Sequence, residues 1–397
     1  VSPRAKSVLE EIKECDFIVC DEGELTLKEL ISALKNGKPL SQVKGICYRE
    51  NGVVYENFRR EVIDPLDKIE NPFKNLNFIG EKNFKVLPVE TMRGCRYKCK
   101  FCFYSKGRNK IREFSEKKVF DFLNYALKES PCEKIYLMDP DFTSNKKRAQ
   151  KICSFICENN FYLKQIHTEV RAEEIDEEMA FFLKKANIVD VEVGLQSTNE
   201  EVLKLSGRPT NINLVKQGIN NLNKEGIKSE LQIILGLPSD TKESFLKSID
   251  DSVEMAPTTL ACFRLLVLPG TYFFDNAGKF SFVYEKKPPW KIIKTDKIDE
   301  EEMIKLSRCS IYASYLYSNF KLTTKYLLKE LKMSHSQLAY IFALDESSYF
   351  VDEPISSTKH RDIISNHIPS LIEKICKKER LNFGFYNAIM TREMAFK

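Results

Sequence analysis

The sequence is poor in several features that mark particular classes of protein. It has only four histidines in 397 residues, and no apolar run reaches the roughly 18 residues that a membrane-spanning helix needs. No secretory signal is visible at its start. Its 62 basic and 57 acidic residues give a net charge of +5, which is too balanced to favour nucleic acid as a partner. We therefore expect a globular protein without a membrane span.

Cysteine, by contrast, is plentiful. The chain has 12 cysteines, and in a sequence of this length without a secretion signal they argue against a disulfide framework. A reducing compartment is the better match, so we expect a cytoplasmic protein. Most of these thiols, such as Cys153 and Cys157 in a predicted helix, fit the small buried side chains of a hydrophobic core.

Residues 1–75 predict a first, small α/β unit. It combines two helical patterns, a short apolar run between them, and a hairpin around Asn51 and Gly52, a pair typical of tight turns. The helical patterns and the apolar run cover residues 5–14, 25–36 and 17–20. Prolines and glycines then mark a linker, after which the pattern changes.

Residues 76–275 alternate short apolar runs with helical stretches. The apolar runs cover residues 84–89, 134–138, 163–169, 189–193, 230–235 and 262–268. Because alternating β and α units build a parallel sheet, we predict an α/β fold. The units fit a partial, open (β/α)6 barrel, in which the chemistry lies at the carboxyl ends of the strands. Residues 276–397 do not continue this alternation and predict a mostly helical C-terminal region.

Three cysteines directly after the first predicted barrel strand have a special spacing. Cys95, Cys99 and Cys102 read C-x3-C-x2-C. Iron–sulfur clusters take cysteine ligands at such short spacings, and three thiolates on a cubane of four irons leave one iron open. The flanking basic residues are expected to lower the pKa of these thiols: Arg93, Arg96, Lys98 and Lys100. Zinc is the alternative, but it usually takes four nitrogen or sulfur ligands, and no second cysteine pair with knuckle spacing follows.

This motif resembles the signature of the radical SAM superfamily, whose members use S-adenosylmethionine (SAM). Phe101 before the last cysteine and the apolar Phe103 after it are typical of that family. The resemblance implies a [4Fe–4S] cluster whose open iron chelates the amino and carboxylate groups of SAM. One electron, from a donor such as flavodoxin or ferredoxin, then cleaves the sulfonium and yields a 5′-deoxyadenosyl radical. The protein orients the cofactors and excludes water.

The same resemblance implies cofactor contacts at the ends of the later strands. Asp139 stands where relatives place residues near the SAM amino group, although many have Gly-Gly-Glu there. Arg208 matches an arginine that pairs with the SAM carboxylate, and Gln232 stands where some relatives have a ribose-binding aspartate. The full set of implied cofactor-binding residues is Phe101, Asp139, Glu169, Gly194, Gln196, Ser197, Arg208, Gln232 and Gly236. Taken singly, each of these residues also fits a purely structural role.

Two further segments resemble the branch of the superfamily that carries a cobalamin-binding domain. Residues 16–24, followed by an amphipathic helix, resemble the last strand, loop and helix of that domain, and residues 266–271 recur in the same branch. The earlier half of a cobalamin domain is not in the sequence, and no histidine precedes His167. We therefore expect either part of a longer protein, which the non-methionine start favours, or a chain without an ordinary cobalamin site.

Three hypotheses for function follow from these patterns. The first is a radical SAM enzyme that uses cobalamin to methylate an unactivated carbon of an organic substrate. The second is a radical SAM enzyme that works without cobalamin and performs a rearrangement, oxidation or cyclisation. The third, from another class, is a non-catalytic zinc-binding protein. The spacing of the three cysteines and the order of the strand-end residues favour the first two.

Overall fold

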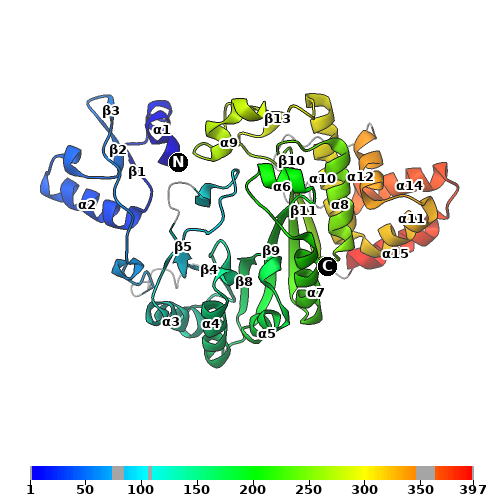
Figure 1. Cartoon of the computed structure of the whole chain (residues 1–397), viewed down its shortest axis with the longest axis horizontal. Helices are drawn as coiled ribbons and strands as arrows, with labels where there is room; N and C mark the ends of the chain where they lie inside the picture. Colours follow the sequence, from blue (N-terminus) through cyan, green and yellow to red (C-terminus); the bar gives the residue numbers. More distant parts are fainter. Residues whose placement is uncertain (1, 74–84, 106–109, 346–362, 396–397) are drawn as a thin grey trace.

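The chain forms three regions that follow one another along the molecule. The computed structural model describes residues 2–73, 85–105, 110–345 and 363–395. In Figure 1 an N-terminal α/β unit (blue), a central sheet with its helices (cyan to green) and a C-terminal group of helices (orange to red) are arranged along the long axis. The predicted boundary between the first two regions, at residues 75 and 76, lies outside the described residues.

The N-terminal unit is an antiparallel sheet between two helices. Its elements are α1 (Ala5–Glu11), β1 (Phe17–Val19), α2 (Gly23–Asn36), β2 (Ile46–Glu50) and β3 (Val53–Glu56). The strands pair in the order β1, β2, β3, and the predicted hairpin joins β2 to β3, with Asn51 and Gly52 both at positive φ. Leu9 of α1 and Leu30 of α2 are buried in separate clusters on the two faces of this sheet.

The central region is a parallel six-stranded sheet with its strands in sequence order. They are β4 (Val86–Val89), β7 (Lys134–Leu137), β8 (Gln165–Val170), β9 (Ile188–Gln196), β10 (Lys228–Leu235) and β11 (Thr259–Arg264). Every neighbouring pair is parallel. Within the described ranges the two edge strands, β4 and β11, do not pair with each other, so the barrel stays open. The predicted α/β fold with a partial barrel is confirmed.

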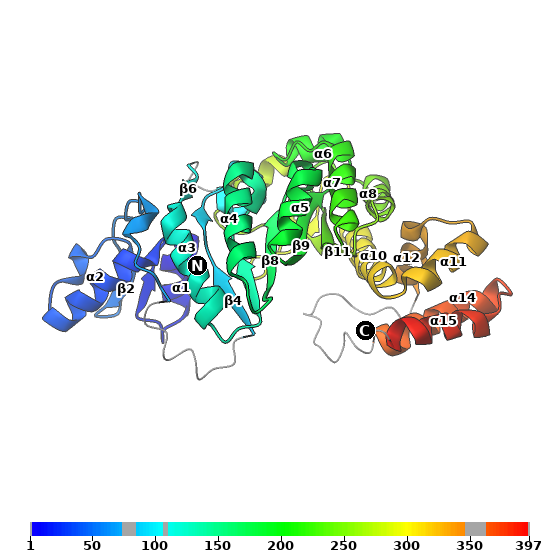
Figure 2. The same ribbon diagram turned by 90° about the horizontal axis from the view of Figure 1, so that it is seen from below.

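Helices cover the outer face of this sheet, as the view from below shows (Figure 2). They are α3 (Glu116–Asn124), α4 (Lys146–Asn159), α5 (Glu177–Lys185), α7 (Ile212–Lys224) and α8 (Lys242–Glu254). Successive side chains of a strand point to opposite faces. On β7, Ile135 and Leu137 are therefore fully buried under the helices, while Lys134 and Tyr136 face the inner side and are only partly buried. The inner side carries the polar residues of the site.

The sequence predicts helices near residues 115–128, 146–159, 176–185, 212–225 and 242–255, and these five helices begin within about one residue of those starts. All five start at a side chain that accepts an N–H group of the first turn; the capping residues are Ser115, Asn145, Asp176, Asn211 and Thr241. Two features were not predicted. The chain after α3 is π-helical over Tyr125–Glu129, and a short helix, α6 (Glu200–Leu205), follows β9.

The C-terminal region is mostly helical, as predicted, and shares the core of the barrel. Its helices include α10 (Glu300–Asn319), α11 (Lys321–Leu331), α12 (His335–Leu344), α14 (Ile368–Lys378) and α15 (Phe383–Ala395). Helix α10 packs along β11, and Tyr312 and Tyr317 are buried there as core residues. Helices α12 and α15 were not predicted. The sequence also predicts a helix over residues 361–378, which agrees with α14, and the first two residues of that range lie outside the described residues.

Short elements surround the carboxyl end of the barrel. They are the paired strands β5 (Met92–Arg93) and β6 (Arg112–Glu113), the helix α9 (Tyr272–Asp275), and the paired strands β12 (Val283–Tyr284) and β13 (Ile292–Lys294). The N-terminal segment reaches the same place, since Arg4 lies over the ring of Trp290.

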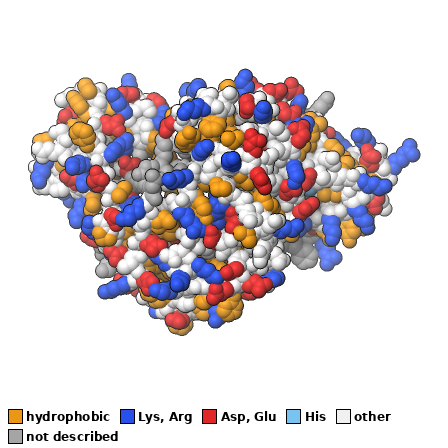
Figure 3. Space-filling model, in the orientation of Figure 1, with side chains coloured by type: hydrophobic (Ala, Val, Ile, Leu, Met, Phe, Trp, Pro, Cys, Tyr) orange, Lys and Arg blue, Asp and Glu red, His pale blue; other side chains and the backbone are white. Residues whose placement is uncertain are grey.

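Basic and acidic side chains are interspersed over the face drawn in Figure 3. In the part of the chain that the structure describes, no helix has the length and apolar character needed to cross a membrane.

Candidate functional site

The three cysteines share one pocket at the carboxyl end of the barrel. Strand β5 follows β4 and leads directly into the loop that carries Cys95, Cys99 and Cys102, and all three line the same pocket. None of the three forms a disulfide with another described residue, and Cys99 is buried. No three Cys, His, Asp or Glu side chains of the described residues are grouped so as to hold a single metal ion. The chemistry available here is that of three thiols on one wall of a pocket.

Backbone packing fixes the shape of this cysteine loop. The Lys100 N–H donates to the carbonyl oxygen of Ser206 at 2.9 Å, and the Lys100 carbonyl accepts from the Phe273 N–H at 3.1 Å. Gly207 has a φ of +66°, and a Cβ atom there would lie 2.7 Å from the carbonyl oxygen of Lys98. Only glycine fits at such a close approach with positive φ. The loop is therefore wedged between the turn after α6 and helix α9.

Most of the strand-end residues implied by the resemblance line the pocket with the cysteines. They are Phe101 of the cysteine loop, Glu169 of β8, Gly194 and Gln196 of β9, Arg208 after α6, and Gln232 of β10. Consecutive parallel strands end at the same edge of a sheet, which is why residues so distant in the sequence meet here.

Arg208 connects the strand ends to the cysteine loop. Its Nη1 donates to Sγ of Cys99 at 3.5 Å, and its Nη2 donates to the carbonyl oxygen of Gly194. Its Nε is buried and has no hydrogen-bond partner among the residues that the structure describes. Gly194 makes room for this arrangement, because a Cβ atom there would lie 2.4 Å from Nε2 of Gln196 and 3.2 Å from Nη2 of Arg208. The pocket thus holds a guanidinium with an unused donor beside the thiols.

Three of the implied residues are not brought into the pocket. The carboxylate of Asp139 is fully buried and accepts the N–H groups of Thr91 and Met92 at 2.8 and 3.2 Å. Ser197 is buried against the hydroxyl of Ser248, 3.3 Å away. Gly236 has a φ of +89° and a Cβ there would touch Ile292 and Met303. None of the three implied residues lines the pocket, and each has a structural role that accounts for its position.

Other pocket residues were not predicted from the sequence. They are Tyr97, Tyr104, Pro140, Val170, Arg171 and Glu192. Glu192 precedes Gly194 by two residues on β9, so the alternation of strand faces was a signal that could have found it. Arg171 lies with its guanidinium 4.0 Å from the ring centre of Tyr97, and its buried Nη1 meets no hydrogen-bond acceptor in the described part of the chain. It adds a second unused donor near the cysteine loop.

The inner face of the sheet carries a charged network beneath the pocket. His167 lies between two carboxylates, with Nδ1 bonded to Asp190 and Nε2 3.2 Å from Glu192. Lys134 donates to Asp190 at 2.7 Å, and Gln232 donates to Glu192 at 2.9 Å. The hydrogen bonds that His167 donates to the two carboxylates raise its pKa to about 9, and the same bonds lower the pKa values of Asp190 and Glu192. This network therefore fixes the positions of Glu192 and Gln232, which line the pocket.

Burial has the largest effect on the pKa of the first cysteine, Cys95, and it acts in the direction opposite to the one predicted from the sequence. The flanking cations were expected to lower the thiol pKa values. Instead, desolvation raises the pKa of Cys95, and the backbone N–H of Tyr97 and the charge of Arg208 offset it only in part. The flanking arginines are engaged elsewhere, since Arg93 pairs with Glu90 at 2.9 Å and Arg96 pairs with Glu174. The nearest available positive charge comes from Arg208, far away in the sequence.

A second, larger cavity adjoins the first. It encloses about 600 Å³ between the N-terminal unit and the cysteine loop. Its walls include the turn after β1, with Asp21 and Glu22, and the residues Arg93 and Phe103 next to the cysteines. Tyr104 lines both cavities, so they meet at this side chain.

Comparison with known proteins finds a radical SAM domain in the central region. A model of the radical SAM superfamily matches residues 89–252. The uncharacterized methyltransferase PH0819 of Pyrococcus horikoshii is 27% identical over 344 residues, which cover 82% of this chain and 72% of that protein. The anaerobic magnesium-protoporphyrin IX monomethyl ester cyclase of Cereibacter sphaeroides is 27% identical over 252 residues, covering 60% of this chain and 41% of the cyclase. This chain thus spans less than half the length of that cyclase.

Solved structures share the fold at lower identity. The cobalamin-dependent S-adenosylmethionine radical enzyme OxsB, solved with aqua-cobalamin bound, has a TM-score of 0.65 and 17% identity, covering 99% of this chain and 66% of OxsB. The radical S-adenosylmethionine methyltransferase TsrM from Kitasatospora setae, solved with tryptophan and a SAM analogue, has a TM-score of 0.59 and 16% identity, covering 74% and 60%. The resemblance that the cysteine motif implied is confirmed for the central region: residues 89–252 match the radical SAM superfamily, and the chain is similar to proteins named as methyltransferases.

Proposed function

We propose that this protein binds a [4Fe–4S] cluster through Cys95, Cys99 and Cys102 and reductively cleaves SAM. The observation that carries the proposal is the shared pocket, in which three thiols meet Arg208 and the ends of three consecutive strands. The donor set fits the cluster, since three thiols line one pocket, and Arg208 and Arg171 beside them each keep a buried nitrogen without a hydrogen-bond partner among the described residues. When bound, such a cluster leaves one iron open for SAM and passes an electron to its sulfonium.

The residues of the pocket have distinct roles in this proposal. Arg208 pairs with the carboxylate of SAM, since its guanidinium contacts Cys99 and its Nε has no hydrogen-bond partner among the described residues. Glu169, Gln196 and Gln232 orient the rest of SAM through hydrogen bonds, and Phe101 covers it with an apolar surface. One electron from a carrier such as flavodoxin or ferredoxin breaks the bond between sulfur and C5′, which gives methionine and a 5′-deoxyadenosyl radical. The radical then removes a hydrogen atom from an organic substrate.

Methylation of an unactivated carbon with help from cobalamin is the first candidate for the next step. Its support is the similarity to the methyltransferase PH0819 and the fold shared with OxsB and TsrM. The second cavity, which meets the SAM pocket at Tyr104, is the place where a further cofactor or the substrate would bind. The second candidate is a radical oxidation or cyclisation without cobalamin, which the similarity to a cyclase favours. Cobalt content of the full-length gene product separates the two.

Metal analysis after anaerobic purification tests the proposal. We expect about four iron and four sulfide per chain, as a single cubane requires. Cys95→Ala, Cys99→Ala and Cys102→Ala should each abolish formation of 5′-deoxyadenosine from SAM under reductant. Cys157→Ala is the matched control, because Cys157 is an exposed free cysteine outside the pocket and its loss should change nothing. Stoichiometric zinc without iron would instead favour the non-catalytic zinc protein.

A further inference from the structure

The residues just before the first cysteine form a short stalk that is held from two sides. This stalk, residues 91–94, runs from the end of β4 to Cys95 and includes β5, which pairs with β6. Gly94, its last residue, has a φ of +94°, and a Cβ atom there would lie 2.9 Å from the carbonyl oxygen of Lys110. Any shift of the stalk is therefore passed on directly to Cys95.

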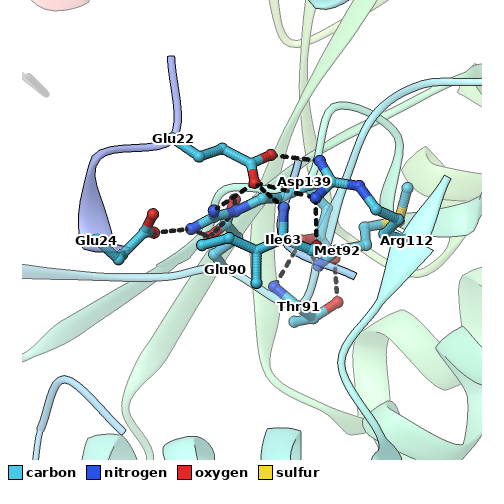
Figure 4. Close-up of polar contacts among 9 residues, drawn as sticks. Glu22, Glu24, Ile63, Glu90, Thr91, Met92, Arg112 and Asp139 are labelled. Carbon is cyan, nitrogen blue, oxygen red and sulfur yellow. Dashed lines mark hydrogen bonds and ion pairs between the residues drawn. The ribbon is translucent and has the colours of Figure 1, made fainter. Parts of the chain in front are cut away.

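The barrel holds one side of the stalk. Asp139, at the end of β7, accepts both the N–H and the hydroxyl of Thr91 and the N–H of Met92. Arg148 of α4 donates to the Thr91 hydroxyl at 2.8 Å and to the Thr91 carbonyl at 2.9 Å. Figure 4 shows the dashed hydrogen bonds that join Asp139 to Thr91 and Met92. These bonds account for Asp139 without any contact to SAM.

The N-terminal unit holds the other side. Glu22, in the turn between β1 and α2, accepts from both terminal nitrogens of Arg112 on β6, and it also accepts the N–H of Ile63 at 2.8 Å. Its carboxylate lies 3.7 Å from Nη1 of Arg93, the stalk residue. Glu24 accepts from Nη2 of the same Arg93. Figure 4 shows Glu22 and Glu24 approaching the stalk from the N-terminal unit.

The ion pair between Glu22 and Arg112 is buried, unlike a pair at the surface. The side chains of Glu22 and Arg112 are only 7% and 3% exposed. When one partner of a buried pair loses its charge, the other is left uncompensated, so the local structure must open or rearrange. The neighbouring pair of Glu29 and Arg60 lies in the same N-terminal unit, but its glutamate is 45% exposed and does not touch the stalk. The two glutamates are therefore suited to a matched comparison.

We infer that Glu22 is a positioning residue for the cysteine loop. It holds the stalk through Arg112 and Arg93, while Asp139 holds the stalk from the barrel side. The N-terminal unit then helps to position the cluster site, although it contributes none of the cysteines. This inference rests on the proposed function only where it concerns the cluster. The order of the stalk itself is a property of the chain without iron.

Hydrogen–deuterium exchange on the iron-free full chain tests the positioning directly. Glu22→Gln keeps the size of the side chain and removes its charge. We expect amides of residues 91–103 and 110–114 to exchange at least about ten-fold faster, a change equal to about 1.4 kcal/mol, while β10 stays unchanged. Glu29→Gln should leave all of these segments unchanged. Equal exchange in wild type and Glu22→Gln would overturn the inference.

A second readout concerns the reconstituted protein. In Glu22→Gln the cluster should be lost to an iron chelator faster than in wild type, and the change in its electron paramagnetic resonance signal on adding SAM should weaken. Glu22→Asp, which restores the charge, should recover part of both. If Glu22→Gln does not fold, Glu24→Gln replaces it, because Glu24 is 35% exposed and contacts the stalk only through Arg93. A wild type without iron would refute the proposed function, and the exchange data would still decide the role of Glu22.

Discussion

Replacing His167 by glutamine should remove a pH-dependent part of the stability of the barrel. The imidazole bridges Asp190 and Glu192 on the inner face of the sheet, and the ring of Tyr136 lies 5.0 Å away. Lys134 also belongs to this network, since it forms an ion pair with Asp190. Because both carboxylates favour the protonated ring, His167 is an imidazolium at neutral pH. Glutamine keeps a polar side chain there but cannot carry this charge.

The size and sign of the effect follow from the two protonation states. A pKa raised from 6.5 to about 9 corresponds to about 3 kcal/mol, at about 1.4 kcal/mol per unit. Since the Glu192 side chain is 36% exposed and partly screened by water, we expect about 1–3 kcal/mol. The folded pKa lies above the unfolded one, so this stability is fully present below pH 6.5 and is lost as pH rises through 9.

Urea unfolding at pH 6 and at pH 9.5 measures this contribution. The free energy of unfolding of the wild type should fall by about 1–3 kcal/mol more than that of His167→Gln between these two pH values. Lys134→Gln is the control, because it removes a charge from the same network but leaves the histidine to titrate. Parallel losses of stability in wild type and His167→Gln would refute this account of the network.

Two other substitutions test the site and the core. Arg208→Gln should weaken SAM binding about 10- to 100-fold, since a hydrogen bond to a charged group contributes about 1.5–3 kcal/mol, while the iron content stays the same. Equal affinity in equilibrium dialysis would exclude Arg208 as the carboxylate partner. Gly218→Ala should destabilise the fold by more than the about 1–3 kcal/mol that overpacking usually costs, because its Cβ atom would lie 1.9 Å from the carbonyl oxygen of Ala172. Its melting temperature should fall accordingly. A melting temperature equal to that of the wild type would contradict the close packing of α7.

The barrel and the pocket could be predicted because their signals are local and repeated. Apolar runs and helical stretches alternate over the central region, and their order in the sequence is also the order of the strands in the sheet. The ends of parallel strands meet, so Glu169, Gln196, Arg208 and Gln232 could be grouped from the sequence alone. Helix α12 gave no such signal, because it is packed between α8 and α10 and lacks a continuous polar face.

The direction of a side chain at the end of a strand could not be read from the sequence. Asp139 and Glu169 both belong to strand ends, yet Asp139 turns to the backbone of the stalk while Glu169 lines the pocket. The contribution of the N-terminal unit was also hidden, since Glu22 and Arg112 are 90 residues apart in the chain. Such pairings depend on how separate units pack, and no periodic pattern encodes them.

Cleavage of SAM by the anaerobically reconstituted full chain tests the central claim most directly. With a chemical reductant, the wild type should convert SAM to methionine and 5′-deoxyadenosine in equal amounts, and Cys99→Ala should form neither. A wild type that holds a complete iron–sulfur cluster and binds SAM, but yields no 5′-deoxyadenosine under these conditions, would contradict the account.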